Sequence, residues 1–363
     1  MHTPKEIHFF LGANAPAGFF SLYDQLVDPH TDETLYILKG GPGCGKSSFM
    51  KTIAKGLSDA GLTVEQIHCS ADPDALDAIY IPALGMAYVD GTAPHIIEPT
   101  YMAVFDQYIN LGELYDCDAM RPLKSQVIEL TNAYKALYTR AYDCITAAHG
   151  VVRELSTQVV NESVIAAVRK RTKGIISREI GKRKSGNAKI TRRFLSALTP
   201  QGSIAHFDTV DTLAGRVYHL DNQFGLAHYM LTDLLEAATA AGLDCIACPS
   251  PLNPDRLEHL FILPLDLAFV SSNFQIQYAG AAYRHIRLDA MVDSERLTSQ
   301  KARIRFSKKV FALLMDEAVR TLDEAKGLHD KLEQLMNPHV DFDGVYDLAE
   351  YHLQLLLEKA IAH

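Results

Sequence analysis

Long apolar runs, a dense framework of cysteines and a secretory leader are all missing from this sequence. No apolar stretch reaches the length that a membrane-spanning helix needs. Six cysteines are spread over 363 residues, without the dense framework of a disulfide-stabilised domain, which is typical of a reducing compartment. The N-terminal residues lack the apolar core of a signal peptide. These absences predict a cytoplasmic protein with no membrane partner.

The charge of the chain is unevenly distributed. The chain has a net charge of −9, yet residues 169–193 hold eleven Lys or Arg and a single acid, Glu179. That segment is therefore +10, and the rest of the chain is −19. A body this acidic argues against broad nucleic-acid binding.

Three interpretations of residues 169–193 stay open. The one that we favour is a solvated, mobile linker. The second is a lid that places an arginine on the γ-phosphate of a nucleotide. The third is a docking segment for an anionic partner such as RNA or a phosphorylated substrate. The segment contains no aromatic residue, so it lacks the rings on which bases would stack.

The rest of the composition is that of an ordinary globular protein. Hydrophobic residues make up 48% of the chain and charged residues 22%. The length allows a large buried core and favours two domains.

The most informative stretch is residues 35–57. An apolar run, residues 35–38, predicts a buried strand, and the apolar spacing of residues 49–57 predicts a helix. Between them, Gly40, Gly45, Lys46 and Ser47 fit the Walker A pattern of nucleotide-binding loops. We call residues 40–48 the glycine loop. A strand before this motif and a helix after it are the context that the Walker A interpretation requires.

The residue types of the glycine loop suit a nucleoside triphosphate. Glycines let the backbone curl tightly, so that several N–H groups point inward at the phosphates. The following helix directs its positive end at them. Lys46 is expected to reach the outer phosphates and Ser47 to bind Mg²⁺. The expected nucleotide-binding residues are Gly40, Gly41, Pro42, Gly43, Cys44, Gly45, Lys46, Ser47 and Ser48.

ATP is the expected nucleotide. The chain has no Asn-Lys-x-Asp or Thr-Lys-x-Asp element for reading guanine. Lys39 stands before the loop, so it does not match the signature lysine of the deviant Walker motif.

The second expected metal ligand is Asp90. It ends an apolar run, as the carboxylate of a Walker B strand does, so Ser47 and Asp90 are predicted to hold Mg²⁺, with Lys46 and Asp90 as the catalytic residues. The alternative is that Asp90 caps a turn with Gly91. No Glu follows Asp90 to activate water, so the base is unassigned among Asp72, Asp74, Glu98 and Glu113.

The chain also repeats itself at an offset of 181 to 184 residues. Residues 10–18, 72–77 and 81–89 resemble residues 194–202, 253–258 and 262–270, in the same order. We therefore predict an α/β protein of two tandem P-loop NTPase-like units, residues 1–190 and 191–363.

Each copy reads as a strand, a loop with a helix, a second strand (63–69; 243–248), a Pro-Asp turn with a short helix, and a third strand (85–89; 267–270). This alternation predicts mostly parallel sheets covered on both faces. Residues 122–172 and 294–335 follow with long helical periodicity. They are expected either to project as helical hairpins or to pack on the sheets.

The second copy lacks the glycine loop. Residues 221–230, which we call the second loop, retain Gly225 but have no lysine, and His228 is the basic residue nearest to it. We therefore expect one active nucleotide site and one degenerate copy.

A family resemblance follows from three stretches, residues 40–47, 67–76 and 89–95. Together they resemble an uncharacterised bacterial family of tandem P-loop ATPase-like proteins, over nearly the whole chain. The resemblance implies the fold and ATP binding. Family members commonly keep a phosphate loop in the second half, which this chain lacks.

Two further groups could bind a metal. His68, Cys69 and His95 follow strands at the edge that carries the glycine loop, where they could line a cleft or ligate an ion. Cys245 and Cys248 form a C-x-x-C pair, but the alternation of a regular strand places their thiols on opposite faces.

The function that these observations favour is Mg²⁺-dependent ATP hydrolysis at one site. Two alternatives stay open. One is a phosphotransferase that moves the γ-phosphate to a small molecule. The other is a nucleotide-gated scaffold that does not hydrolyse ATP.

Overall fold

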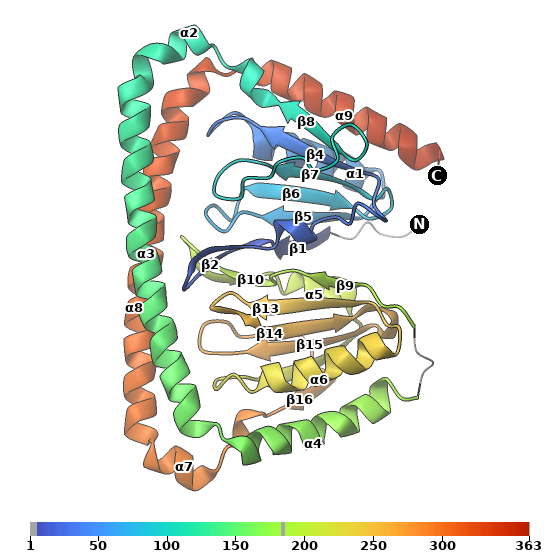
Figure 1. Ribbon diagram of the computed structural model, residues 1–363, viewed down its shortest axis with the longest axis vertical. Coiled ribbons are helices and arrows are strands. Elements are labelled where there is room, and N and C mark those ends of the chain that lie inside the picture. The colour runs from blue at the N-terminus through green and yellow to red at the C-terminus, as the bar shows by residue number, and fades with distance from the viewer. Residues whose placement is uncertain (1–5, 183–185, 363) are drawn as a thin grey trace.

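The computed structural model describes residues 6–182 and 186–362, and shows two α/β units beside a pair of long helices (Figure 1). Each unit contains a six-stranded sheet. The first has the order β1 (Glu6–Phe10), β5 (Val64–His68), β6 (Leu76–Ile81), β7 (Met86–Asp90), β4 (Thr34–Lys39), β8 (Asp106–Asn110). The second has the order β16 (Arg284–Ile286), β12 (Arg216–Asp221), β15 (Leu267–Ser272), β14 (Asn253–Ile262), β13 (Cys245–Ser250), β9 (Ile190–Arg192).

The two sheets have the same pattern of strand directions, as the sequence repeat predicts. β6 and β14 run antiparallel to both of their neighbours, and the other pairs are parallel. The sheets are therefore mixed. The prediction of a short helix after each Pro-Asp turn is wrong, because these residues form β6 and β14. β6 is buried at nearly every position, which suits an interior strand.

One helix in each unit follows the loop and packs on its sheet. α1 (Lys46–Asp59) buries Phe49, Met50, Ile53, Ala54 and Leu57, and α6 (Ala227–Ala240) buries a comparable stripe. This spacing is that of an amphipathic helix with one face on the core. The strand, loop and helix predicted around residues 35–57 are confirmed as secondary structure.

The units meet through reciprocal contacts. Phe10 and Phe194 are equivalent in the repeat, and each donates its backbone N–H to the carbonyl of the other, at 2.8 and 2.9 Å. Next to them lie two hairpins and a short helix: β2 (Gly12–Ala15) with β3 (Gly18–Ser21), β10 (Ser196–Thr199) with β11 (Gly202–Ala205), and α5 (Asp208–Leu213). A central core draws buried residues from both units, so they share one interior.

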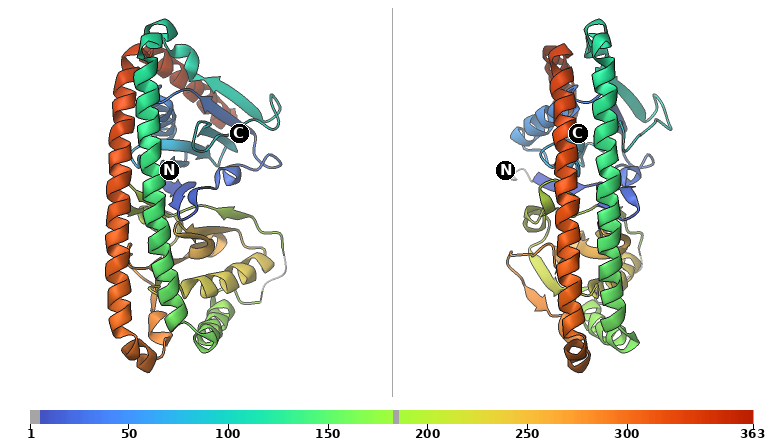
Figure 2. Two further views of the ribbon diagram at one scale, coloured as in Figure 1. Left: turned by 60° about the vertical axis from the view of Figure 1, so that its left-hand side comes forward. Right: turned by 90° about the vertical axis from the view of Figure 1, so that its left-hand side faces the viewer.

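Two helices of 36 residues each, α3 (Lys124–Val159) and α8 (Lys301–Met336), run antiparallel along both units (Figures 1 and 2). At 1.5 Å per residue each is about 54 Å long. They pack through a cluster with buried members on both helices: Ala141, Ile145, Ala148, Phe311, Met315, Ala318 and Leu322. The long helical segments are confirmed, and they pair with each other rather than projecting as separate hairpins.

The helices beyond this pair are exchanged between the units. α4 (Glu162–Glu179) follows the first sheet in sequence but packs on α6 of the second unit. α9 (Phe342–Ala362) follows the second sheet but packs on α1 of the first. The short elements are α2 (Cys117–Met120), α7 (Ser294–Ser299), η1 (Tyr23–Gln25), η2 (Leu111–Leu114), η3 (Arg121–Leu123), η4 (Leu263–Leu265), η5 (Asp289–Met291) and η6 (Asn337–His339).

The favoured interpretation of residues 169–193 as a mobile linker is wrong for most of the described part. Residues 169–179 belong to α4, and residues 190–192 form β9. Residues 183–185 lie outside the described part of the chain.

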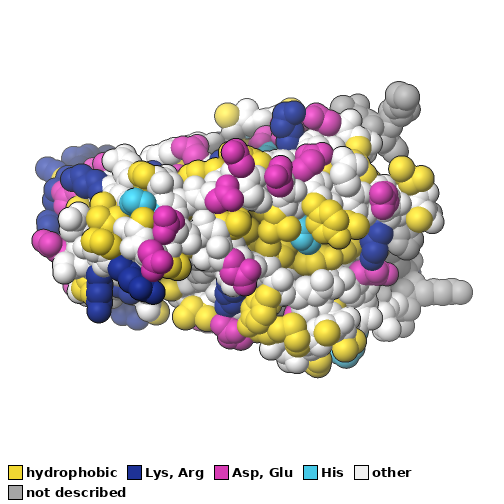
Figure 3. Space-filling view, turned by 90° about the horizontal axis from the view of Figure 1, so that it is seen from above, with side chains coloured by type: hydrophobic (Ala, Val, Ile, Leu, Met, Phe, Trp, Pro, Cys, Tyr) yellow, Lys and Arg dark blue, Asp and Glu magenta, His cyan; other side chains and the backbone are white. Residues whose placement is uncertain are grey.

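No helix within residues 6–182 and 186–362 combines the length and apolar character that a bilayer crossing requires. Figure 3 views the end of the molecule that carries α9 and β8, where hydrophobic side chains mix with acidic ones. Tyr346, Tyr351 and Leu355 of α9 are exposed.

One basic residue of the segment 169–193 holds the units together from inside. Arg193 is 1% exposed, and its guanidinium forms an ion pair with Glu65 of β5. It also donates to the carbonyls of Gln25 (2.6 Å) and Leu26 (3.3 Å). Arg193 thus crosslinks the start of the second unit to the first.

We predict that Arg193→Met lowers the free energy of unfolding by about 3 to 5 kcal/mol, because it leaves Glu65 as an uncompensated buried charge. Urea unfolding followed by circular dichroism measures the change. The control is Lys55→Met, which breaks an exposed i,i+4 pair with Asp59 and should cost less than about 1 kcal/mol. Equal costs for the two variants would contradict the role of Arg193.

Candidate functional site

The glycine loop connects β4 to α1 at one edge of the first sheet. Gly43 has φ of +72° and Gly45 has φ of +86°, a backbone region that side chains other than glycine rarely adopt. Gly45 is the residue before the first turn of α1. Among the described residues, the N–H groups of Gly43, Gly45 and Ser47 meet no acceptor. The loop therefore presents free donors beside a helix N-terminus, which suits an anionic group.

Lys46 and Asp90 come together beneath this loop. The Lys46 Nζ donates to the carbonyls of Gly40 (3.0 Å) and Gly41 (2.9 Å) and lies 3.6 Å from Asp90 Oδ2. Both side chains are mostly buried, at 10% and 15% exposure. Asp90 reaches this place because β7 is parallel to β4, in a register that pairs it with Leu38. The structure thus brings together residues that are 44 positions apart in the chain.

Ser47 and Asp90 each also have a local structural role. The Ser47 hydroxyl accepts a hydrogen bond from the N–H of Leu76 at 2.9 Å. The other carboxylate oxygen of Asp90 accepts from the N–H (2.8 Å) and the hydroxyl (2.6 Å) of Thr92. Asp90 therefore caps the turn, as the alternative reading proposed, while its second oxygen faces Lys46. The two roles are compatible, because they use different oxygens.

Cys44 fills the space inside the glycine loop. It is buried, and burial raises the pKa of its thiol, while the nearby Lys46 charge opposes the rise. A Cβ added to Gly40 would lie 2.5 Å from the Cys44 sulfur, so this position has no room for a side chain. The backbone carbonyl of Ser48 accepts a hydrogen bond from the Thr52 hydroxyl at 3.0 Å.

Near the first unit, the segment that leads into α3 and the segment that leaves α8 both touch the glycine loop. Tyr115, just before α2 and α3, donates its hydroxyl to the Pro42 carbonyl at 2.8 Å. Asn337, just after α8, donates its side-chain amide to the carbonyls of Gly43 (2.9 Å) and Glu333 (3.0 Å) in the orientation that satisfies both of its polar atoms. The loop is thus clamped by segments that continue to the other unit.

Asp77 is a site residue that the motif analysis missed. β6 is antiparallel to β7 with Ala78 opposite Val89, which places Asp77 beside Asp90. Ligand atoms of Asp77, Asp90 and His95 lie within 4.8 Å of one another. Burial raises the pKa of the Asp77 carboxyl group. The nearby His95 opposes this rise, and the charge of Asp90 adds to it. The repeat held a signal for it, because Asp77 is matched by Glu258, an acid in both copies.

The four acids considered as the base make contacts away from Lys46. Glu98 binds Lys39 and Tyr108 at 2.7 and 2.6 Å. Asp72 lies 3.5 Å from Lys326, and Asp74 accepts from Gln201 at 3.2 Å. The fourth, Glu113, accepts from Asn110 at 2.9 Å. None of these contacts joins an acid to the Lys46–Asp90 pair within the described chain.

His68, Cys69 and His95 do not form one cluster. His68 faces the contact between the units, with Nε2 at 3.0 Å from the Nδ1 of His8 and its ring 4.4 Å from that of His206. Cys69 lies beside Asp77, and burial, then the Asp77 charge, raises the pKa of its thiol. His95 joins Asp77 and Asp90 instead.

The prediction that the thiols of Cys245 and Cys248 lie on opposite faces of their strand is confirmed. Cys245 belongs to the core beneath α6, whereas Cys248 belongs to the central core on the other face of the sheet. Both are free and buried, and burial raises the pKa of Cys245 to about 12.

In the second loop, two other side chains make the contacts that Lys46 and Ser47 make in the glycine loop. Arg256 donates to the Gly225 carbonyl at 2.7 Å, as Lys46 does to the carbonyls of the first loop. His228 accepts from the N–H of Leu257 at 3.2 Å, which is the role of Ser47 in the first unit. Burial, and then Arg256, lowers the pKa of His228 to about 4, so this imidazole is neutral near pH 7.

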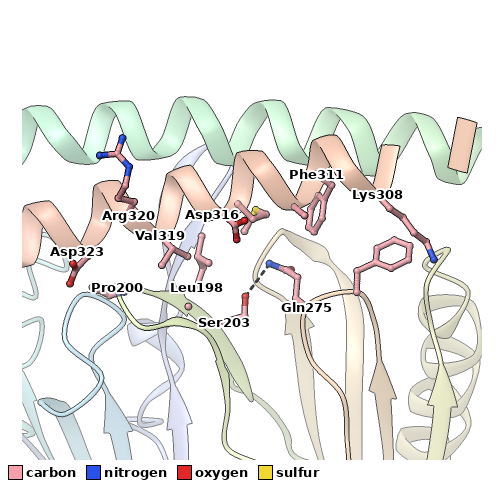
Figure 4. Close-up of a pocket in the computed structure, with 14 residues that line it drawn as sticks. Leu198, Pro200, Ser203, Gln275, Lys308, Phe311, Asp316, Val319, Arg320 and Asp323 are labelled. Carbon is pink, nitrogen blue, oxygen red and sulfur yellow. Dashed lines mark hydrogen bonds between the residues drawn. The ribbon is translucent and has the colours of Figure 1, made fainter. Parts of the chain in front are cut away.

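A separate cavity of about 600 Å³ lies between α8 and the β10–β11 hairpin (Figure 4). Leu198, Phe311 and Val319 are among its apolar walls, and Gln275 donates to Ser203 at 3.0 Å on its floor. Its size suits a small molecule. None of the site residues that the sequence predicts is among those that line it, so the glycine loop remains the stronger candidate.

No family model, no curated protein and no solved structure matches this chain. The resemblance to a tandem P-loop family therefore stays a prediction, and the case for function rests on the geometry above.

Glu258 is the counterpart of Asp77 in the second unit. It is 4% exposed, and burial raises its pKa to about 7. Hydrogen bonds from Asn273 and Ser196 act in the opposite direction and lower the pKa. The folded chain thus binds this proton more tightly than the unfolded chain does, from about pH 4.5 to 7. Stability from Glu258 is therefore greatest below this window and is lost as the pH rises through it.

We predict that the unfolding free energy of the wild type falls relative to that of Glu258→Gln between pH 4.5 and 7, by up to about 3 kcal/mol, and that the difference is constant above pH 7. Urea unfolding at several pH values tests this. Glu236→Gln, an exposed change on α6, is the control and should leave the pH profile unaltered. A profile for Glu258→Gln that parallels the wild type would refute the assignment.

Proposed function

We propose that this chain binds one Mg-ATP at the glycine loop and hydrolyses it slowly. The observation that carries the proposal is the convergence of Lys46, Asp90 and the free N–H groups of the loop at the N-terminus of α1. This is the arrangement expected of a P-loop NTPase, and it supports that class for the first unit.

Each group then has a defined task. The N–H groups of Gly43, Gly45 and Ser47 hold the phosphates, and Lys46 exchanges its loop carbonyls for phosphate oxygens, because charge-assisted bonds to phosphate are the stronger ones. Ser47 and Asp90 would hold Mg²⁺, which supplies charge neutralisation on the phosphates. Ser47 is well placed because its hydroxyl is already fixed by Leu76.

The second loop supports a single nucleotide site. Its N–H groups are already engaged by side chains, because Asp289 accepts from the N–H of Gln223 (3.1 and 3.0 Å) and Asn222 accepts from the N–H of Ala227 at 2.8 Å. We therefore assign the second unit a structural or regulatory role.

A nucleotide-gated scaffold is the second candidate, and one observation favours it. The segments before α3 and after α8 touch the glycine loop through Tyr115 and Asn337, and the helices themselves touch the second loop through Ser156 and Lys308. A nucleotide that moves the first loop would shift both helices. Tight ATP binding without ADP release, together with altered protease cleavage of α3 or α8, would select this candidate. ADP release that depends on an added acceptor would instead select a phosphotransferase.

We predict that Lys46→Ala weakens Mg-ATP binding by at least about 100-fold, because it removes a charge-assisted contact to the phosphates. Equilibrium binding of a fluorescent ATP analogue measures the affinity, and circular dichroism checks the fold.

The matched control is His228→Ala in the second loop, which should leave the affinity unchanged. An unaltered affinity in Lys46→Ala, or a loss of equal size in His228→Ala, would overturn the site assignment.

A further inference from the structure

His95 stands out in the first unit because its ring is buried without a polar partner. The residue is 7% exposed, and within the described chain neither of its ring nitrogens has a hydrogen-bond partner. A buried imidazole normally bonds through at least one nitrogen, so two unpartnered nitrogens call for an explanation.

The ring is held in a fixed orientation beside two carboxylates. Tyr23 stacks on it with the ring centroids 4.3 Å apart and the planes 11° from parallel. The same tyrosine donates its hydroxyl to Asp77 Oδ2 at 2.7 Å, so it fixes the carboxylate and the imidazole together. Such outer contacts are typical of the support around metal ligands.

The distances between Asp77, Asp90 and His95 suit three ligands of one shared ion better than direct hydrogen bonds between these side chains. One ligand atom each from Asp77, Asp90 and His95 lies within 4.8 Å of the others. No hydrogen bond or ion pair joins His95 to either carboxylate in the described structure. Ligands of one transition-metal ion at about 2.0 to 2.2 Å lie roughly 3 to 3.5 Å apart. A small inward movement would therefore bring all three onto a cation.

The second unit provides an internal comparison. Glu258 replaces Asp77, but Ser271 stands where Asp90 does, opposite Leu220 as Asp90 is opposite Leu38. Phe207 takes the place of Tyr23 and packs edge-on against Tyr278 and His259, with ring centroids 5.2 and 6.2 Å apart, and it has no hydroxyl to donate to a carboxylate. There, the glutamate accepts a hydrogen bond from Asn273. The second unit has a buried imidazole too, His259, but its Nδ1 accepts from the N–H of Ser271 at 3.2 Å. Among the described residues, an imidazole with both nitrogens unpartnered lies beside two carboxylates in the unit that keeps the glycine loop.

We propose that Asp77, Asp90 and His95 form a binding site for a first-row transition-metal dication, zinc or manganese. One imidazole and two carboxylates are donors that these ions accept, whereas Mg²⁺ prefers oxygen ligands alone. The site does not need a nucleotide. It shares Asp90 with the proposed ATP site, so the ion would stand next to the phosphates.

The test is calorimetric titration of Zn²⁺ into the nucleotide-free full chain, together with electron spin echo spectroscopy of bound Mn²⁺. We expect one tightly bound ion per chain and nitrogen modulation from an imidazole ligand. His95→Gln should abolish the nitrogen modulation, and the isosteric Asp77→Asn should weaken Zn²⁺ binding by at least tenfold while the fold is retained.

Two controls separate this site from its neighbours. Lys46→Ala should keep the metal while losing ATP, so failure of the ATP proposal and failure of this one are distinguishable. His285→Gln removes a ligand from the His219–Asp221–His285 group on the second unit, whose ligand atoms also lie within 4.8 Å of one another. Metal binding that survives Asp77→Asn and His95→Gln but is lost in His285→Gln, or no binding by the wild type, would overturn the proposal.

Discussion

The antiparallel packing of α3 against α8 is the interaction on which the rest of this structure depends. Each helix begins beside one loop and ends beside the other, so the pair holds both loops at a fixed separation. Tyr115 and Asn337 bind the carbonyls of the glycine loop, while Ser156 donates to Phe224 of the second loop at 2.9 Å. Because α4 and α9 continue from this pair onto the opposite units, neither unit can complete its helical layer without the sequence of the other.

This construction is compatible with two loops that differ in sequence within one duplicated chain. The helices need the carbonyls of both loops, but they do not need a nucleotide in either. In the second unit, Asp289 accepts hydrogen bonds from the N–H of Gln223, and Asn222 accepts from the N–H of Ala227, so side chains of the protein occupy donors of this loop. That loop is therefore stable without a ligand. In the first unit, the N–H groups of Gly43, Gly45 and Ser47 meet no acceptor within the described chain, and the nearby His95 ring has no hydrogen-bond partner there.

Local patterns in the sequence predicted the parts of the fold that local forces decide. The apolar strand, the positive-φ glycines and the amphipathic spacing of α1 all follow from neighbouring residues. The repeat predicted two equivalent units because it compares residues directly. The sequence could not show that β6 is a strand, since a six-residue buried run is compatible with a helix or a strand until its neighbours are known. The exchange of α4 and α9 is tertiary, and so is the approach of Asp77 to Asp90 across two strands. The buried role of Arg193 was hidden in a segment whose charge suggested exposure.

The central claim is that one of the two loops, and only one, binds a nucleotide. The most direct measurement is the stoichiometry of Mg-ATP binding to the full chain by isothermal titration calorimetry. The account predicts one Mg-ATP per chain, with the second loop closed by Arg256. A stoichiometry of two would contradict the assignment of the second loop, and the absence of any binding would contradict the assignment of the first.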